Sequence, residues 1–158
     1  MFVVRDYEHV NAPIERCFQL ATHLQLVSDV LGMKAVERNG ARSEGLVAGG
    51  DRVVWYGWKF GLPHMHESVI SRYDPPIFFQ DTMERGRFKR FQHDHQFNEV
   101  GGHTLMVDYV RFSLPMGLAG RLVGRQIVVP HVVKLLRTRL LLLRRLAEGE
   151  GWRQYLEK

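Results

Sequence analysis

The residues with the clearest capacity for chemistry in this chain are histidines arranged in two His-x-His pairs. One pair lies in HMH at 64–66 and the other in FQHDHQF at 91–97. Imidazole titrates near neutral pH, binds metals, and donates or accepts hydrogen bonds. Alternate residues of a strand point to one face, so the histidines of the second pair share a face with two phenylalanines. Those phenylalanines indicate that this face is buried.

A carboxylate is expected close to these histidines. In HTLMVDYVRFSL, at 103–114, every second residue from Met106 to Leu114 is apolar except Asp108. A carboxylate on an apolar wall needs a partner. The turn at Gly101-Gly102 sets the register between the two strands, and we expect it to pair residues whose numbers sum to 201. The pairs that this register predicts are His93 with Asp108, His95 with Met106, and Phe91 with Val110.

Three uses of the histidines follow from this arrangement. As metal ligands, the two His-x-His pairs would lie about 9–10 Å apart, because the strand expected at 77–84 separates them. Zinc–nitrogen bonds of about 2.0–2.1 Å need closer donors, so we expect no metal. As a catalytic pair, His93 would be a general base oriented by Asp108. The sequence places no serine or cysteine nucleophile beside this pair, so the chemistry would be proton transfer, as in aldol cyclisation or dehydration.

The third use is in the wall of a pocket. There the histidines would satisfy Asp108 and hydrogen-bond the polar end of a ligand on a mainly apolar lining. We favour this interpretation and expect no cofactor. The strand at 51–61 adds aromatic residues, with Trp55 on one face and Trp58 on the other, and parity alone does not decide which face lines a cavity.

The elements that must position these residues form an α+β pattern. The sequence predicts a strand at 1–10, then a helix in NAPIERCFQLA with Asn11 as N-cap and Pro13 in its first turn, and a second helix in THLQLVSDVLG that ends at Gly32. Antiparallel strands separated by Gly- and Pro-containing turns follow. These strands are expected at 33–39, 43–49, 51–61, 64–73, 77–84, 87–97 and 103–114.

After Pro115 the apolar period becomes helical. Pro130 predicts a kink or break near 126–130. The glycines of GLAGRLVG either let the start of the helix lie close to the sheet or permit its entry to move as a gate. We expect the helix to cross the concave face of a curved sheet and to leave a cavity between them. The apolar stripe that would face the sheet comprises Leu118, Leu122, Val129, Val133, Leu136, Leu140 and Leu143.

The composition indicates one globular domain over 1–158, since 45% of the residues are hydrophobic and 25% are charged. We expect no signal peptide, because MFVVRDYEHV is too short an apolar run for one, and no apolar run is long enough to span a membrane. Its single cysteine, Cys17, cannot form an internal disulfide and lies on the apolar face of the first helix. We therefore expect a cytoplasmic protein in which Cys17 acts as a small buried hydrophobe.

The net charge of +5 comes from the C-terminal part of the chain, where no acidic residue lies between Asp108 and Glu148. This segment lacks the interleaved aromatic residues that stack on bases, so we expect no nucleic-acid partner. A solvated basic helix face is the expected arrangement. The alternative is weak contact with an anionic membrane surface. The residues that would carry that contact are Arg137, Arg139, Arg144 and Arg145.

Several segments of the chain are similar to those of a known superfamily. NAPIERCF, ISRYDPPIFFQDTMERGRF and FQHDHQFNEVGGHTLMVDYVRFSLPMGLAG, followed by the closing helix, resemble the START-like (SRPBCC) superfamily. That group includes polyketide cyclases and dehydratases, birch-pollen-allergen relatives and coenzyme-Q-binding proteins, and the bacterial cyclase/dehydratase-like branch is the nearest. The resemblance implies a helix-grip fold, in which six or seven antiparallel strands wrap around a long C-terminal helix. It supplies no shared set of catalytic residues.

The resemblance and the residues together predict binding or transport of a hydrophobic small molecule, such as a lipid, polyketide, isoprenoid or aromatic compound. One alternative is a cyclase or dehydratase that uses His93 and Asp108. The other is a membrane- or protein-interaction module that uses the basic helix. Ligand identity and oligomeric state stay open. The residues expected to contact the ligand are His66, Phe91, His93, His95, Met106, Asp108, Val110, Phe112, Trp58, Val133 and Leu136.

Overall fold

A computed structural model of the protein describes residues 1–157. The elements in chain order are β1 (Phe2–Val10), α1 (Ile14–Ala21), α2 (Leu24–Leu31), β2 (Lys34–Val36), β3 (Arg52–Lys59), β4 (Leu62–Asp74), β5 (Phe78–Arg85), β6 (Arg90–Val100), β7 (His103–Ser113), α3 (Gly117–Val123), the π-helical segment η1 (Gly124–Val128), α4 (Val129–Glu148) and α5 (Arg153–Leu156).

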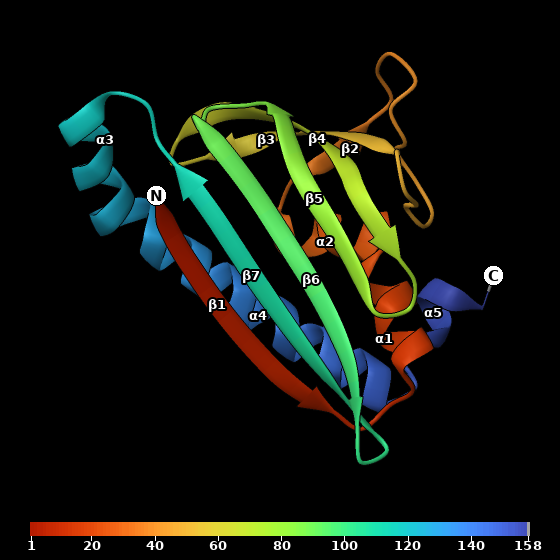
Figure 1. Ribbon diagram of the computed structural model, residues 1–158. Helices are drawn as coiled ribbons and strands as arrows, with labels where there is room; N and C mark the ends of the chain where they lie inside the picture. Colours follow the sequence, from red (N-terminus) through yellow and green to blue (C-terminus); the bar gives the residue numbers. More distant parts are fainter. Residues whose placement is uncertain (158) are drawn as a thin grey trace.

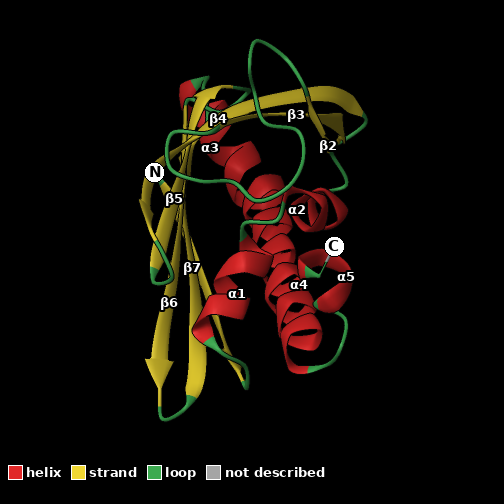
Figure 2. Cartoon of the chain, turned by 90° about the vertical axis from the view of Figure 1, so that its right-hand side faces the viewer, coloured by secondary structure: helices red, strands yellow, loops and turns green. Residues whose placement is uncertain are grey.

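The strands form a single seven-stranded sheet in the order β1-β7-β6-β5-β4-β3-β2, and every neighbouring pair is antiparallel. Figure 1 shows α4 running behind β1 and β7 on the far side of the sheet. The side view shows α1, α2, α4 and α5 on one face, with β3 and β2 bending over the helical layer (Figure 2). The predicted α+β helix-grip architecture is confirmed.

The helix that follows β7 changes its geometry where proline demands it. α4 begins at Val129 with Pro130 in its first turn, and the turn before it is the π-helix η1. Pro130 has no N–H and its ring crowds the preceding carbonyls, so a wider turn at this place relieves the conflict. The predicted irregularity near 126–130 is therefore present, as a π-helical turn within a continuous helical run.

The predicted apolar stripe of this helix is wrong at its beginning. Leu118, Leu122 and Val133 are 76%, 58% and 48% exposed. α3 buries only Gly120, because it lies beyond the end of β7 and not against the sheet (Figure 1), and on α4 the buried residue is Val132 in place of Val133. The positions of α4 that are buried are Val132, Leu136, Arg139, Leu140, Leu143, Leu146 and Ala147.

Two predictions near the N-terminus need correction. The segment 43–49 is a loop and not a strand, and an isolated β-bridge joins its Leu46 to His23, the residue before α2. Gly45, Gly49 and Gly50 interrupt any strand there. The first helix starts at Ile14, and its N-cap is Pro13 without a side-chain hydrogen bond, so Asn11 is not the cap.

The expected stop of the second helix and the expected close approach of the helical run to the sheet are both confirmed. Gly32 has a left-handed φ of 64°, and its N–H bonds to the carbonyl of Ser28. A Cβ atom on Gly124 would lie 2.3 Å from the ring of Phe2, so only glycine lets η1 pass β1 this closely.

The buried core lies between the concave face of the sheet and the helices. One cluster joins α1, α2 and α4 to the middle strands, and a second surrounds Phe112 under the start of α4. Within residues 1–157, no helix combines the length and the hydropathy needed to cross a membrane.

Candidate functional site

A cavity of about 180 Å³ lies between the curved sheet and the helices α2 and α4. Most of its wall is apolar, and α2, α4 and five strands contribute to it. The polar residues of the wall are Thr22, Lys59, His64, His66, Asp81, His93, His95, His131 and Arg139. The cavity therefore has the character of a small-molecule site, an apolar lining with a few polar groups.

The structure brings six of the predicted contact residues to this wall. They are His66, Phe91, His93, His95, Val110 and Leu136. Met106, Asp108 and Phe112 are buried in the core and do not line the cavity.

Two predicted contact residues point away from the cavity, and both expectations are wrong. Trp58 is 66% exposed and Val133 is 48% exposed. In β3, the inward face carries Trp55 and Lys59, so the even-numbered Trp58 faces outward by the strand period of two. On α4 the buried position is the neighbouring Val132, which lies about 100° round the helix from Val133.

The register between β6 and β7 differs from the prediction by two residues. Gly101 and Gly102 form a two-residue turn with φ of 57° and 82°, so Val100 and His103 are the first pair and the numbers sum to 203. A shift of two keeps every side chain on its predicted face. The observed pairs are His95 with Asp108, His93 with Val110, Phe97 with Met106, and Phe91 with Phe112.

Asp108 lies at the centre of a buried polar cluster. His95 Nδ1 is 2.9 Å from Asp108 Oδ1, and Arg139 Nη1 donates to Asp108 Oδ2 at 2.5 Å. His93 Nε2 approaches Oδ1 to 3.4 Å, but it makes no hydrogen bond to any residue that the structure describes. The predicted contact of His93 with Asp108 therefore exists as a diagonal one, while the hydrogen-bonded histidine is His95.

The charge state of this cluster follows from its surroundings. Burial alone would raise the pKa of Asp108, but the charge of Arg139 and the two imidazoles hold it well below its usual range. Burial, with Arg139 and His93 nearby, lowers the pKa of His95 well below 6.5. Asp108 is therefore an anion that only accepts, so neutral His95 must donate from Nδ1 and keep its lone pair on Nε2.

The same cluster contains donor atoms for a metal ion. One ligand atom each from His93, His95 and Asp108 lies within 4.8 Å of the others. Arg139 already supplies the positive charge that a cation would bring to this carboxylate, so the cluster is electrically balanced as it stands. The sequence analysis considered only the two His-x-His pairs, which β5 does separate, and did not foresee this grouping.

Arg139 itself was assigned to the solvated face of the helix, and the structure corrects this. Its residue exposure is 7%, in line with the apolar positions one turn before and after it. A signal for it was present in the sequence, because Asp108 on an apolar wall requires a cation and Arg139 follows Leu136 by three residues.

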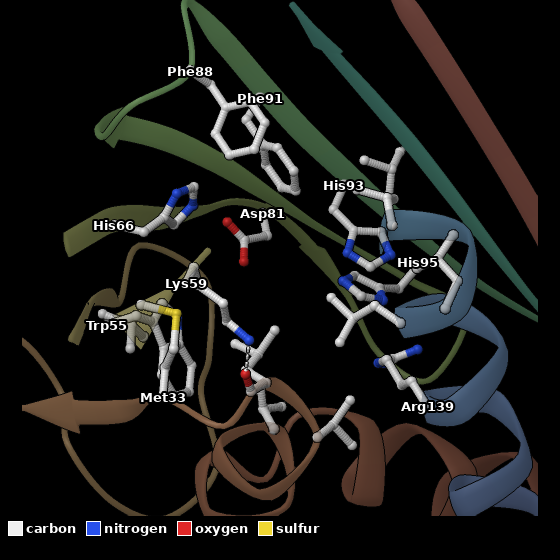
Figure 3. A pocket seen from close by; sticks show the side chains of 18 of the residues that line it. Met33, Trp55, Lys59, His66, Asp81, Phe88, Phe91, His93, His95 and Arg139 are labelled. Carbon is white, nitrogen blue, oxygen red and sulfur yellow. Dashed lines mark hydrogen bonds between the residues drawn. The ribbon is translucent and has the colours of Figure 1, made fainter. Parts of the chain in front are cut away.

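A second polar group on the wall is the carboxyl of Asp81 on β5, which the sequence analysis missed. Asp81 stands directly across from His93 on β6, and its backbone pairs with Ile70 of β4 on the other side. Figure 3 shows its carboxyl between the rings of His66 and His93. Strand parity could have found it, since Asp81 shares a face with buried Phe79.

Asp81 contributes an unsatisfied polar atom to the wall. Its Oδ1 atom is buried and has no hydrogen-bond partner within residues 1–157. Burial raises the pKa of Asp81 above 3.8, and nearby His66 and His93 only partly oppose this. Burial also lowers the pKa of His66. An acid and a base side by side are therefore both pushed toward their neutral forms.

Lys59 and His131 are further polar groups of the wall, on the β3–β4 hairpin and at the start of α4. Lys59 Nζ donates to the carbonyl of Leu31, and burial lowers the pKa of its ammonium (Figure 3). The ring of Phe60 lies 5.0 Å from that of His131 and links the hairpin to α4. Burial, with Lys59 nearby, also lowers the pKa of His131.

The basic excess of the C-terminal helix is mostly paired. Arg137 bonds to Asp6 and Glu8, and Arg144 bonds to Glu8 and Glu148. With Arg139 buried, three of the four arginines expected to face a membrane have acidic partners in the protein. Cys17 is buried and burial raises the pKa of its thiol to about 11, which fits its expected role as a hydrophobe.

Comparison with known structures finds the same fold in proteins of low sequence identity. TTHA0849 from Thermus thermophilus is 22% identical, over 91% of this chain and 95% of that one, with a TM-score of 0.66. A START superfamily protein from Mycobacterium smegmatis is 12% identical, over 89% and 98%, with a TM-score of 0.63. Ara h 8.0201 is 12% identical, over 90% and 97%, with a TM-score of 0.62.

These similarities define the fold of the chain as the START-like helix-grip fold, as expected. No protein-family model matches the sequence, and no curated protein matches it. The fold is shared by proteins of different functions, so function is argued from the site.

Proposed function

We propose that this protein binds a hydrophobic small molecule in the cavity between the sheet and α4. The observation that carries the proposal is the wall itself. It places aromatic and aliphatic side chains from α2, α4 and five strands around one space, and Asp81 on this wall has a carboxyl oxygen without a partner among residues 1–157. Each CH₂ group of a ligand that leaves water for such a wall contributes about 0.8 kcal/mol.

The test is native mass spectrometry of the freshly purified protein, followed by solvent extraction to identify any apolar molecule that accompanies it. The expected result is a discrete mass added to the polypeptide, which is lost on extraction. A Leu135→Trp variant is the matched control, because Leu135 lines the cavity and a larger ring there would fill it. If the added mass is absent, and the extracted protein binds no apolar probe such as 2-naphthol, the proposal is wrong.

A cyclase or dehydratase of the bacterial polyketide type is the second candidate. Its support is that His93 lies on the cavity wall, with Nε2 3.4 Å from the Asp108 carboxylate. Against it, Arg139 neutralises that carboxylate, and the hydrogen-bonded His95 has a pKa well below neutral, which makes a weak base. A His93→Ala variant that keeps its ligand and changes no turnover of a polyketone would remove this candidate.

A further inference from the structure

We infer that Asp81, between His66 and His93, is the recognition site for a neutral hydroxyl group on an aromatic ligand. The inference rests on the proposed function and names the ligand class that the cavity would take. Figure 3 shows the three side chains converging from three neighbouring strands, β4, β5 and β6, on one part of the cavity.

The first argument is the unused hydrogen-bonding capacity at this place. Asp81 Oδ1 is buried and makes no hydrogen bond to another of the residues 1–157, whereas His93 Nε2 faces the Asp108 carboxylate 3.4 Å away. Buried polar atoms are satisfied in the great majority of proteins, so a carboxyl oxygen without a partner on a cavity wall points to a partner from outside the chain. A hydroxyl can donate a hydrogen bond to this oxygen and can also accept one.

The second argument is charge. Burial raises the pKa of Asp81 and lowers that of His66, so this part of the wall disfavours charged groups. An anionic group here would face Asp81. A cationic group would require an ionised Asp81 in apolar surroundings, and the cavity already contains Lys59 and Arg139. A neutral hydroxyl avoids both costs.

The third argument is the shape and chemistry of the adjacent wall. The ring of His66 packs edge-on against Phe91 with centroids 5.3 Å apart, and Phe88 lies 5.0 Å from Phe91. Trp55 pairs with His66 across the β3–β4 ladder and also lines the cavity. Aromatic rings favour offset or edge-on contact with another ring, so this surface suits a flat aromatic body next to the hydroxyl.

The experiment compares three probes of one ring system: 2-naphthol, naphthalene and 2-naphthoate. Their Kd values for the wild-type protein are measured by equilibrium dialysis. A plain apolar pocket favours naphthalene over 2-naphthol, because a hydroxyl costs free energy when it leaves water without a partner. We expect the reverse, with 2-naphthol binding roughly tenfold or more tightly than naphthalene.

Variants assign this preference to Asp81. Asp81→Leu is expected to weaken 2-naphthol binding by about tenfold or more and to leave naphthalene binding unchanged. Asp81→Asn keeps a carbonyl acceptor and should retain most of the preference, which also provides a test if the leucine variant folds poorly. Glu84→Leu is the matched control, since Glu84 is an exposed acid on the same strand with its side chain on the opposite face.

The other outcomes each have a defined meaning. Equal binding of 2-naphthol and naphthalene, or the same loss for both in the Asp81 variants, overturns the hydroxyl site and leaves the apolar cavity in place. If 2-naphthoate binds most tightly of the three, the hydroxyl site at Asp81 is also overturned, and the polar end of the ligand is assigned to Lys59. If none of the three probes binds, the hydroxyl site fails, and the proposed function fails with it if the purified protein also carries no apolar molecule.

Discussion

Arg139 of α4 and Asp108 of β7 form a buried ion pair that joins the long helix to the sheet across 31 residues of sequence. Their side chains are 8% and 3% exposed. Removing two charges from water costs several kcal/mol for each, and their attraction offsets this only where further hydrogen bonds satisfy the carboxylate. His95 supplies such a bond, so three elements meet at one carboxylate beside the cavity.

Removal of this arginine should destabilise the protein strongly. Arg139→Met leaves the Asp108 carboxylate buried without a cation, so we expect the free energy of unfolding to fall by about 3–5 kcal/mol. Urea denaturation measures it. Arg145→Met, at an exposed position of the same helix, should change it by less than about 0.5 kcal/mol. An Asp108→Leu/Arg139→Met double variant should recover most of the loss, and a further decrease in stability would contradict the pairing.

The pH dependence of stability should reveal His95. Its pKa in the folded protein lies well below the ordinary 6.5, because burial opposes its protonation. A base whose folded pKa is depressed stabilises the fold fully above its unfolded pKa, and that contribution is lost as the pH falls below 6.5. His95→Gln can still donate to Asp108 but does not titrate. Urea melts at a series of pH values should show a shallower acid decline for this variant, and parallel curves would rule out His95 as the source.

Asp81 should act on stability in the opposite direction. Its pKa is raised in the folded protein, so the wild type loses stability as the pH rises above 3.8, through the folded-state pKa. Asp81→Asn removes this ionisation. We expect the ligand-free Asp81→Asn variant to have a larger free energy of unfolding than the ligand-free wild type. This difference should grow with pH until Asp81 of the wild type is fully ionised. The control is Glu84→Gln on the outer face of β5, and a margin independent of pH would refute the burial of this carboxyl.

Filling the cavity should weaken ligand binding without harming the fold. Leu135 lines the cavity, whereas Val133, two residues earlier on α4, is exposed. Leu135→Trp should weaken 2-naphthol binding about tenfold or more, because the new ring occupies the site. Val133→Trp makes a change of the same kind toward solvent and should leave Kd unchanged. Equal effects of both substitutions, measured by equilibrium dialysis, would place the ligand elsewhere.

Zinc provides a test of the balanced charge at Asp108. We expect added zinc to leave the Tm of the wild-type protein unchanged, because Arg139 already neutralises this carboxylate. Arg139→Met frees Asp108 beside His93 and His95, so zinc should raise the Tm of that variant. A clear rise in the wild type, measured by thermal unfolding with and without zinc, would show that the cluster is a metal site.

Much of the fold could be predicted because local chemistry specifies it. Gly32 ends α2 through a left-handed conformation that glycine adopts without cost, and Pro130 marks the irregular turn of the long helix. Strand parity correctly placed Phe91, His93 and His95 on the inner face, since a period of two survives an error of two in register.

The candidate site was predicted only in part, because side-chain partners depend on several elements at once. The two-residue turn at Gly101-Gly102 pairs His95, and not His93, with Asp108. Arg139 could not be told from its solvated neighbours by charge alone, since its burial depends on which face of α4 lies against the sheet. Asp81 lay within a strand whose faces the sequence analysis did not assign.

The sequence by itself determined the order of the elements, the face of each histidine on β6, and the presence of a long helix with a disturbed start. These are properties of neighbouring residues, and backbone geometry fixes them over a few positions. The tertiary structure alone decided that Arg139 meets Asp108, that Trp55 and not Trp58 faces the cavity, and that Asp81 lies unsatisfied between two histidines. These relations depend on the curvature of the sheet and the rotation of one helix, and no local pattern encodes either of them.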